Sequence, residues 1–259
     1  MKNIPLFIAA LCLSTVANAG VVTQTVDYKQ GDTALKGFLA YDDSIKEKRP
    51  GVLVVHEWWG LNDYAKKRAE QFAKLGYVAF AVDMYGGGAV ATDREKAAEW
   101  ANSVRGNRPL MRERIRAGLQ VLAADKRVDP DRIGAIGFCF GGTTVLELAY
   151  SGANIAGVVS FHGGLVPPGP EDMKAIKAAF LVLHGADDPF MTRDQIADFQ
   201  DGLNKAGVDW QMVYFGGAVH AFSNPAAGDN KSSGVAYNAK AAQRSWEYMQ
   251  LFFREIFAR

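Results

Sequence analysis

Cys139 is the residue in this sequence that is best placed to act as a nucleophile. It stands in the segment Gly-Phe-Cys-Phe-Gly-Gly, residues 137–142, between the apolar run Ile133–Ile136 and a stretch of helical periodicity that starts near Thr143. This segment matches the G-x-S-x-G pattern of a nucleophile elbow, with cysteine in place of serine. The glycines fit, since a β-carbon at either flanking position would clash in so tight a turn. A helix N-terminus directly after the cysteine would favour a thiolate or a developing oxyanion.

The alternative is that Cys139 is a small buried hydrophobic residue, as most free cysteines are. The elbow is favoured because the flanking glycines, the strand before them and the helix after them occur together. A candidate acid and a candidate histidine then follow in the chain order that this elbow requires.

Asp188 and His220 are the candidate acid and base. Two adjacent carboxylates, Asp187 and Asp188, follow the apolar run that closes with Gly185. The spacing from that glycine favours Asp188 as the acid. Asp187 is expected to close the turn or to cap the next helix. The order nucleophile, acid, histidine selects His220, which lies in a loop of small residues. A structural role is the alternative for the other histidines near strand ends, His56, His162 and His184.

Short apolar runs predict strands that are buried on both faces, and segments of helical periodicity separate most of them. We therefore expect an α/β protein, with a doubly wound, mostly parallel sheet flanked by helices. An antiparallel pair is expected to precede it at Val22–Tyr28 and Ala34–Tyr41. The predicted strands of the parallel part are Gly51–Val55, Tyr77–Val82, Ile133–Ile136, Ile155–Phe161, Ala179–Leu183 and Gln211–Phe215, and the predicted helices include Asp63–Leu75, Met111–Ala124, Thr192–Lys205 and Ala236–Phe257.

The ends of these strands decide where a site can form. In open α/β sheets, ligands bind beyond the carboxyl ends of the strands. This fold would gather five residues that lie far apart in the sequence, namely Glu57, Asp83, Cys139, Asp188 and His220.

Composition and charge narrow the class of protein. With 49% hydrophobic and 22% charged residues, the chain resembles ordinary globular proteins rather than disordered ones. The 29 basic and 28 acidic side chains leave no net field to attract nucleic acid, and no long basic stripe is present. No linker divides the chain, so we expect one domain over residues 20–259 and a monomer.

The first 19 residues have the features of a secretory signal peptide. Lys2 precedes an apolar run at Ile4–Leu13, and small residues lead to Gly20. The run is too short to span a membrane as a helix, and Leu11 before Cys12 does not fit a lipoprotein cleavage site. The alternative is a membrane anchor or a buried first helix. Cleavage after Ala19 would give a secreted or periplasmic protein, not bound to a membrane, with Cys139 as its only cysteine.

Together these residues resemble the dienelactone hydrolase family, the α/β-hydrolases with a cysteine nucleophile. The resemblance covers roughly Tyr28 to Phe257. The motifs that carry it are Glu57 after Val54-Val55-His56, Trp59-Gly60-Leu61-Asn62, Asp83-Met84-Tyr85, residues 137–142, Asp188 and His220-Ala221-Phe222.

The resemblance implies further roles. Glu57 would contact the resting thiol and shift when substrate binds, because one anion disfavours a second nearby; the alternative is a surface glutamate. Backbone amides of Trp58 and Phe140 would form the oxyanion hole. Aromatic residues of the crevice, Trp59, Tyr85 and Phe222, are expected to contact substrate, although core packing explains such residues equally well.

One departure from the family concerns substrate. Gly87 and Asn224 occupy places where members of the family carry the arginines that clamp the dienelactone carboxylate, and neither residue can form such a fork. Dienelactone itself is therefore not the expected substrate. Arg94, Arg105 or Arg108 could enter the site from the next segment, or lie on a solvated helix face.

The sequence therefore predicts a hydrolase that cleaves a small-molecule ester or lactone through a thioester on Cys139. A thioesterase or general carboxylesterase on the same scaffold is the enzymatic alternative, and a small-ligand binding module is the non-catalytic one. No metal or cofactor is implied, because His56-Glu57 lacks the second histidine of a zinc-protease helix.

The signal-peptide interpretation is tested on exported protein. We expect N-terminal sequencing of the mature chain to begin at Gly20, with residues 1–19 removed. Exported protein that keeps Met1 would contradict cleavage and favour an anchor.

Overall fold

The computed structural model describes residues 20–258, so the predicted signal peptide, residues 1–19, lies outside the described part of the chain. Its eight strands form one sheet in the order β1-β2-β4-β3-β5-β6-β7-β8. β1 is antiparallel to β2, β2 is antiparallel to β4, and the remaining neighbours are parallel. The strands are β1 (Val21–Gln30), β2 (Thr33–Asp42), β3 (Arg49–Val55), β4 (Val78–Val82), β5 (Val128–Phe138), β6 (Gly157–Phe161), β7 (Ala179–Gly185) and β8 (Trp210–Phe215). The predicted α/β class and the antiparallel opening pair are confirmed.

Both faces of the central strands are apolar, because successive side chains point to opposite faces of a strand. In β3, Val52 and Val54 belong to one core cluster, and Leu53 and Val55 belong to the other. All four side chains are fully buried. A strand of this kind is stable only with helices on both sides of the sheet.

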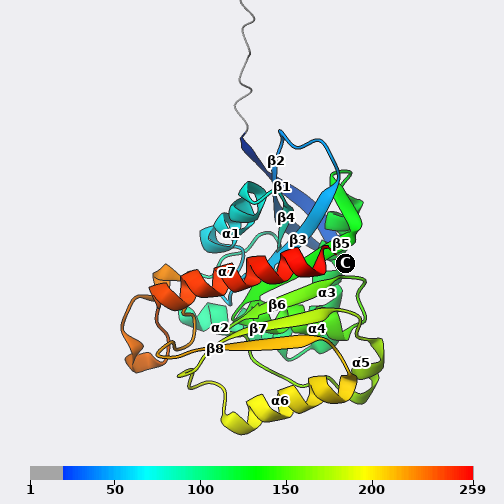
Figure 1. The fold of residues 1–259 in the computed structure, drawn as a ribbon. Helices are drawn as coiled ribbons and strands as arrows, with labels where there is room; N and C mark the ends of the chain where they lie inside the picture. Colours follow the sequence, from blue (N-terminus) through cyan, green and yellow to red (C-terminus); the bar gives the residue numbers. More distant parts are fainter. Residues whose placement is uncertain (1–19, 259) are drawn as a thin grey trace, which may run out of the picture.

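Helices supply that cover (Figure 1). Helices α1 (Asp63–Lys74) and α7 (Ala239–Ile256) pack on one face, whereas α2 (Arg94–Arg105), α3 (Arg108–Ala124), α4 (Phe140–Tyr150) and α6 (Arg193–Ala206) pack on the other. Shorter pieces are α5 (Pro170–Ala175), η1 (Pro225–Ala227) and η2 (Lys231–Ser233). Of the described helices, none combines the length and the apolar character needed to cross a membrane.

The predicted element bounds differ from the structure at several places, and one short helix was not predicted. Helix α4 begins at Phe140 rather than near Thr143, since its first turn contains two glycines and every residue of the helix is buried, which removes the amphipathic signal. Strand β5 starts at Val128, before a register shift against β3. Helix α5 was not predicted, because six residues carry too little periodicity.

Candidate active site

Cys139 occupies the sharp turn between β5 and α4, with φ of 53° and ψ of −112°. A β-carbon at Gly137 would lie 1.9 Å from the carbonyl oxygen of Gly141, and one at Gly141 would lie 2.3 Å from the carbonyl oxygen of Val55. Such distances are far below van der Waals contact, so these two positions require glycine. The geometry expected of the elbow is present, and the cysteine is partly exposed.

A buried histidine holds the backbone of this turn. The Cys139 amide donates to the Phe161 carbonyl at 3.0 Å and to Nδ1 of His162 at 3.1 Å. Because Nδ1 accepts, Nε2 carries the proton and donates to Oγ of Ser223 at 2.8 Å. Burial lowers the pKa of His162 well below its usual value, which keeps the ring neutral as this pattern demands.

His220 and Asp188 form a hydrogen-bonded pair. Nδ1 of His220 lies 2.8 Å from Oδ2 of Asp188, while Oδ1 of Asp188 accepts from the Phe190 amide at 3.0 Å. The His220 backbone is fixed by two hydrogen bonds, one to the Gly234 carbonyl and one from the Ala236 amide. With its Nδ1 proton directed at Asp188, the imidazole presents Nε2 for chemistry.

The charges of the pair are coupled to the cysteine. Burial alone would lower the pKa of His220, but the charge of a Cys139 thiolate and the hydrogen bond to Asp188 raise that pKa to about 10. Burial alone would raise the pKa of the Asp188 carboxyl, but the hydrogen bond and charge of His220 lower it. The imidazolium form of His220 is therefore favoured at neutral pH.

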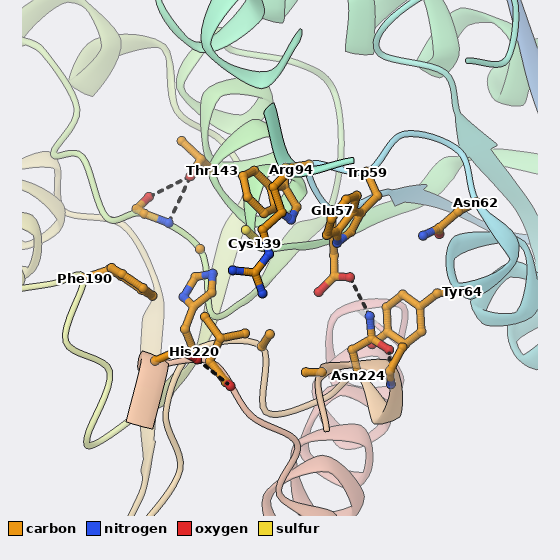
Figure 2. Close-up of a pocket in the computed structure, with 18 of the residues that line it drawn as sticks. Glu57, Trp59, Asn62, Tyr64, Arg94, Cys139, Thr143, Phe190, His220 and Asn224 are labelled. Carbon is orange, nitrogen blue, oxygen red and sulfur yellow. Dashed lines mark hydrogen bonds between the residues drawn. The ribbon is translucent and has the colours of Figure 1, made fainter. Parts of the chain in front are cut away.

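Cys139 and His220 line the same cavity, whose volume is about 1320 Å³. Figure 2 shows both side chains at this cavity, with Glu57 and Asn224 on its other side. Trp58 and Trp59 also line it, so the expected contact from Trp59 has a place there. The loops after β3, β5 and β8 thus meet at one edge of the sheet, as the topology requires.

Glu57 points away from the expected partner. Its Oε2 accepts a hydrogen bond from Nδ2 of Asn224 at 2.6 Å (Figure 2), whereas the resemblance implied contact with the Cys139 thiol. Burial raises the pKa of the Glu57 carboxyl, while the Asn224 hydrogen bond and the charges of His220 and Arg68 lower it. Glu57 is buried, so the alternative of a surface glutamate is wrong.

Tyr85 supports the cavity wall rather than lining it. Its hydroxyl donates to the Trp58 carbonyl at 2.9 Å, and its ring borders a separate, smaller cavity. The Asp83 carboxylate sets this loop by accepting from four backbone amides, those of Lys36, Tyr85, Gly86 and Gly88. The expected substrate contact is therefore replaced by a role in fixing the Trp58 peptide.

The expected substrate contact from Phe222 is also wrong in this structure. The ring is fully buried and packs against His162 and Phe215, because a main-chain turn at Ala221, with φ of 58°, directs it into the core. Two other histidines are structural. His56 contacts the Glu57 carbonyl at 2.5 Å and accepts from the Met84 amide at 3.3 Å, and His184 is buried against Tyr214.

Two arginines enter the cavity wall from the ends of α2. Arg94 and Arg105 both line the cavity, and neither side chain forms a hydrogen bond or an ion pair within residues 20–258. Figure 2 shows Arg94 at the cavity. Arg108 is not available, since it pairs with Glu147 at 2.8 Å and with Asp172 at 3.1 Å. Unpaired cations at a cavity favour an anionic group on a ligand.

Some site residues carried no assigned role in the sequence. The Ser223 hydroxyl accepts the hydrogen bond from Nε2 of His162 and also contacts the Tyr64 hydroxyl at 2.9 Å. The Arg68 guanidinium donates to the Ser223 carbonyl at 3.0 Å. Tyr64 and Arg68 lie four residues apart on α1 and so share a helix face. The four-residue spacing of Tyr64 and Arg68, and the place of His162 at a strand end, were the sequence features that could have indicated these roles.

Comparisons with known proteins point to one family. The sequence pattern of the dienelactone hydrolase family matches residues 35–257. "Protein usf" of Aquifex pyrophilus is 29% identical over 236 residues, which cover 90% of this chain and 98% of that protein. A putative carboxymethylenebutenolidase of Aquifex aeolicus is 28% identical, over 89% of this chain and 97% of the relative. A solved dienelactone hydrolase-like promiscuous phosphotriesterase from metagenomic libraries is 41% identical with a TM-score of 0.88, covering 92% of this chain and 99% of the other.

The electrostatics of the histidine–aspartate pair can be tested without any substrate. We expect Asp188→Asn to lower the pKa of His220 by at least about one unit, because the substitution removes the anion that stabilises the imidazolium. NMR titration of the imidazole signals, assigned with His220→Gln, measures this. Asp187→Asn is the matched control, since Asp187 is exposed and should leave the pKa unmoved. A His220 pKa that stays near 10 in Asp188→Asn would contradict the assignment.

Proposed function

Because the chain belongs to the dienelactone hydrolase family, we propose that it hydrolyses carboxylic esters or lactones with Cys139 as nucleophile, His220 as acid and base, and Asp188 as the residue that orients the histidine. The observation that carries this proposal is the common cavity of Cys139 and His220, together with the 2.8 Å bond from His220 to Asp188. A hydrolase of this family acts on a small molecule, which a cavity of about 1320 Å³ can hold.

The first half of the reaction forms a thioester. The Cys139 thiolate attacks the carbonyl carbon, and the carbonyl electron pair moves to oxygen. When the tetrahedral intermediate collapses, the bond to the leaving alcohol breaks and the His220 imidazolium gives its proton to that alcohol. In a lactone the alcohol stays attached to the acyl group.

The second half returns the enzyme to its starting state. Neutral His220 takes a proton from water, and the resulting hydroxide attacks the thioester carbonyl. Collapse of the second intermediate breaks the carbon–sulfur bond and releases the acid. The thiolate leaves as the better leaving group and remains beside the imidazolium.

Backbone amides of Phe140 and Trp58 are the proposed oxyanion donors. Phe140 is the first residue of α4, so its amide has no acceptor within the helix. Trp58 lines the cavity. The Glu57–Trp58 peptide that carries its amide is held through the Glu57 carbonyl, which contacts Nδ1 of His56 at 2.5 Å and accepts from the Gly60 amide at 3.3 Å. Each donor of this kind typically stabilises the transition state by about 3 to 4 kcal/mol.

Other hydrolytic activities share this machinery. A thioesterase or general carboxylesterase would use the same nucleophile, and the 41% identical relative is named as a promiscuous phosphotriesterase, so phosphotriesters belong in a substrate panel. Membership of a hydrolase family argues against a purely ligand-binding protein. We further propose export after loss of residues 1–19, leaving residues 20–259 as one hydrolase domain. In support, Lys2, the apolar run Ile4–Leu13 and the small residues before Gly20 have the pattern of a secretory signal peptide.

The nucleophile is tested with p-nitrophenyl esters and one thiol reagent. Cys139 is the only cysteine of residues 20–259, so iodoacetamide reports on a single site. We expect alkylation and Cys139→Ala each to lower kcat/KM by about a thousandfold or more. Mass spectrometry of a quenched burst should find the acyl group on Cys139. Hydrolysis that is unchanged by both treatments would remove this nucleophile.

The arginines of α2 are tested by the charge of the acyl group. We expect Arg94→Ala and Arg105→Ala each to lower the ratio of kcat/KM for an ester with a terminal carboxylate to that for a neutral ester, by about threefold, since exposed ion pairs are weak. The double variant should lower the ratio about tenfold. Arg244→Ala, an exposed arginine on α7, is the control. An unchanged ratio in the double variant would show that these cations do not contact the substrate.

A further inference from the structure

The Asn224 side chain joins Glu57 to the loop that carries His220. Its Nδ2 donates to Oε2 of Glu57 at 2.6 Å, and its Oδ1 accepts from the Ala226 amide at 3.0 Å. Because the two ends of the amide have fixed and opposite partners, only one orientation of the side chain satisfies both. Asn224 therefore presents a donor to Glu57 that is held in place by the backbone of its own loop.

Both members of this contact are buried, with exposed fractions of 4% for Glu57 and 6% for Asn224. A hydrogen bond between buried groups resists exchange with water, and loss of one partner leaves the other unsatisfied. Figure 2 shows the Glu57 carboxylate turned toward Asn224 across the cavity that Cys139 also lines. The bond thus fixes where the negative charge of Glu57 lies relative to the sulfur.

Glu57 is the only buried acid among the described residues that line the cavity. Of the described acids that line the cavity, Asp63 is exposed and Glu57 is buried. The Asp188 carboxylate is held by its hydrogen bond with His220. An anion that approached the sulfur would disfavour the thiolate and so keep the proton on the thiol.

The other titratable groups around these two residues do not replace that charge. Burial raises the pKa of Tyr64 to about 12 and raises that of Tyr85 further, so both are neutral at physiological pH. His162 is neutral as well. The groups that face Glu57 are Tyr64, Arg68 and His220, and those that face Cys139 are Tyr85, His162 and His220. The cations Arg94 and Arg105 line the same cavity and are the same in every variant of the test below.

We propose that Asn224 is a positioning residue that holds the Glu57 carboxylate on the His220 loop and away from the sulfur, so that His220 alone controls the Cys139 proton in the resting protein. The inference rests on the proposed function, since it concerns the same thiol. It means that the nucleophile is activated before any substrate binds. An ester with no charged group would then be attacked without a preceding rearrangement of Glu57.

The test follows the rate of Cys139 alkylation by iodoacetamide as a function of pH in the full mature protein. In Asn224→Ala, Glu57 loses its donor and can approach the sulfur. We expect the pH midpoint of alkylation to move up by about one pH unit, and the rate below the midpoint to fall about tenfold. Asn224→Asp keeps the acceptor for the Ala226 amide, so it covers the case in which Asn224→Ala does not fold, and it should move the midpoint in the same direction.

A second background separates positioning from general loosening of the loop. In Glu57→Gln there is no carboxylate to release, so adding Asn224→Ala should leave the midpoint within about 0.2 pH units of that in Glu57→Gln alone. Asn230→Ala removes a comparable side-chain cap, on the Ser232 amide, without touching Glu57. It should leave the midpoint of the otherwise unmodified protein in place.

Two results would overturn the proposal: a midpoint that does not move in either Asn224 variant, or a shift that persists in full when Glu57 is glutamine. Failure of the proposed function looks different. If alkylated protein without the substitutions still hydrolyses esters, Cys139 is not the nucleophile, whatever the Asn224 variants do. If alkylation abolishes hydrolysis and the midpoint stays fixed in the Asn224 variants, only the positioning role is lost.

Discussion

The backbone of Cys139 is held at a φ of 53°, a conformation that residues with a β-carbon rarely adopt. Conformations of this kind cost on the order of 1–3 kcal/mol and persist only where the surroundings enforce them. Here the enforcement comes from the two hydrogen bonds of the Cys139 amide and from the close approach of backbone that Gly137 and Gly141 permit. This turn sets the position of the sulfur, and the other site loops are arranged around it.

Those loops are aimed by bonds between side chains and backbone rather than by packing alone. Asp83 accepts hydrogen bonds from four backbone amides and so fixes the loop of Tyr85, whose hydroxyl in turn holds the Trp58 carbonyl. Thr143 exchanges two hydrogen bonds with the backbone of Gly164. Polar groups buried at the sheet edge are costly when unsatisfied, so each such bond stabilises one loop geometry over its competitors.

The sequence was sufficient for the fold class and for the places of Cys139, Asp188 and His220, because the elbow is a local motif and strand ends converge by topology. It was not sufficient for Phe222, whose ring direction depends on a main-chain turn that no periodicity reveals. The contact of Glu57 with Asn224 joins residues 167 positions apart through one hydrogen bond, and no local pattern encodes it. The sequence allowed Arg94 and Arg105 to lie on a solvated helix face, but their position beside the cavity depends on how α2 packs against the rest of the fold.

Helix α2 contributes a wall of the cavity, yet the side chains of its two arginines form no hydrogen bond or ion pair among the described residues. Exchanging these side chains therefore disturbs neither the strained turn nor the loops bonded to it. Under the proposed function, the residues for reactivity and those for charge selectivity therefore lie in separable stretches of the chain. Related enzymes can therefore acquire different substrate preferences through substitutions at exposed positions of one helix, with little loss of stability. The same separation makes Arg94 and Arg105, on the exposed part of α2, the natural positions to randomise in laboratory evolution.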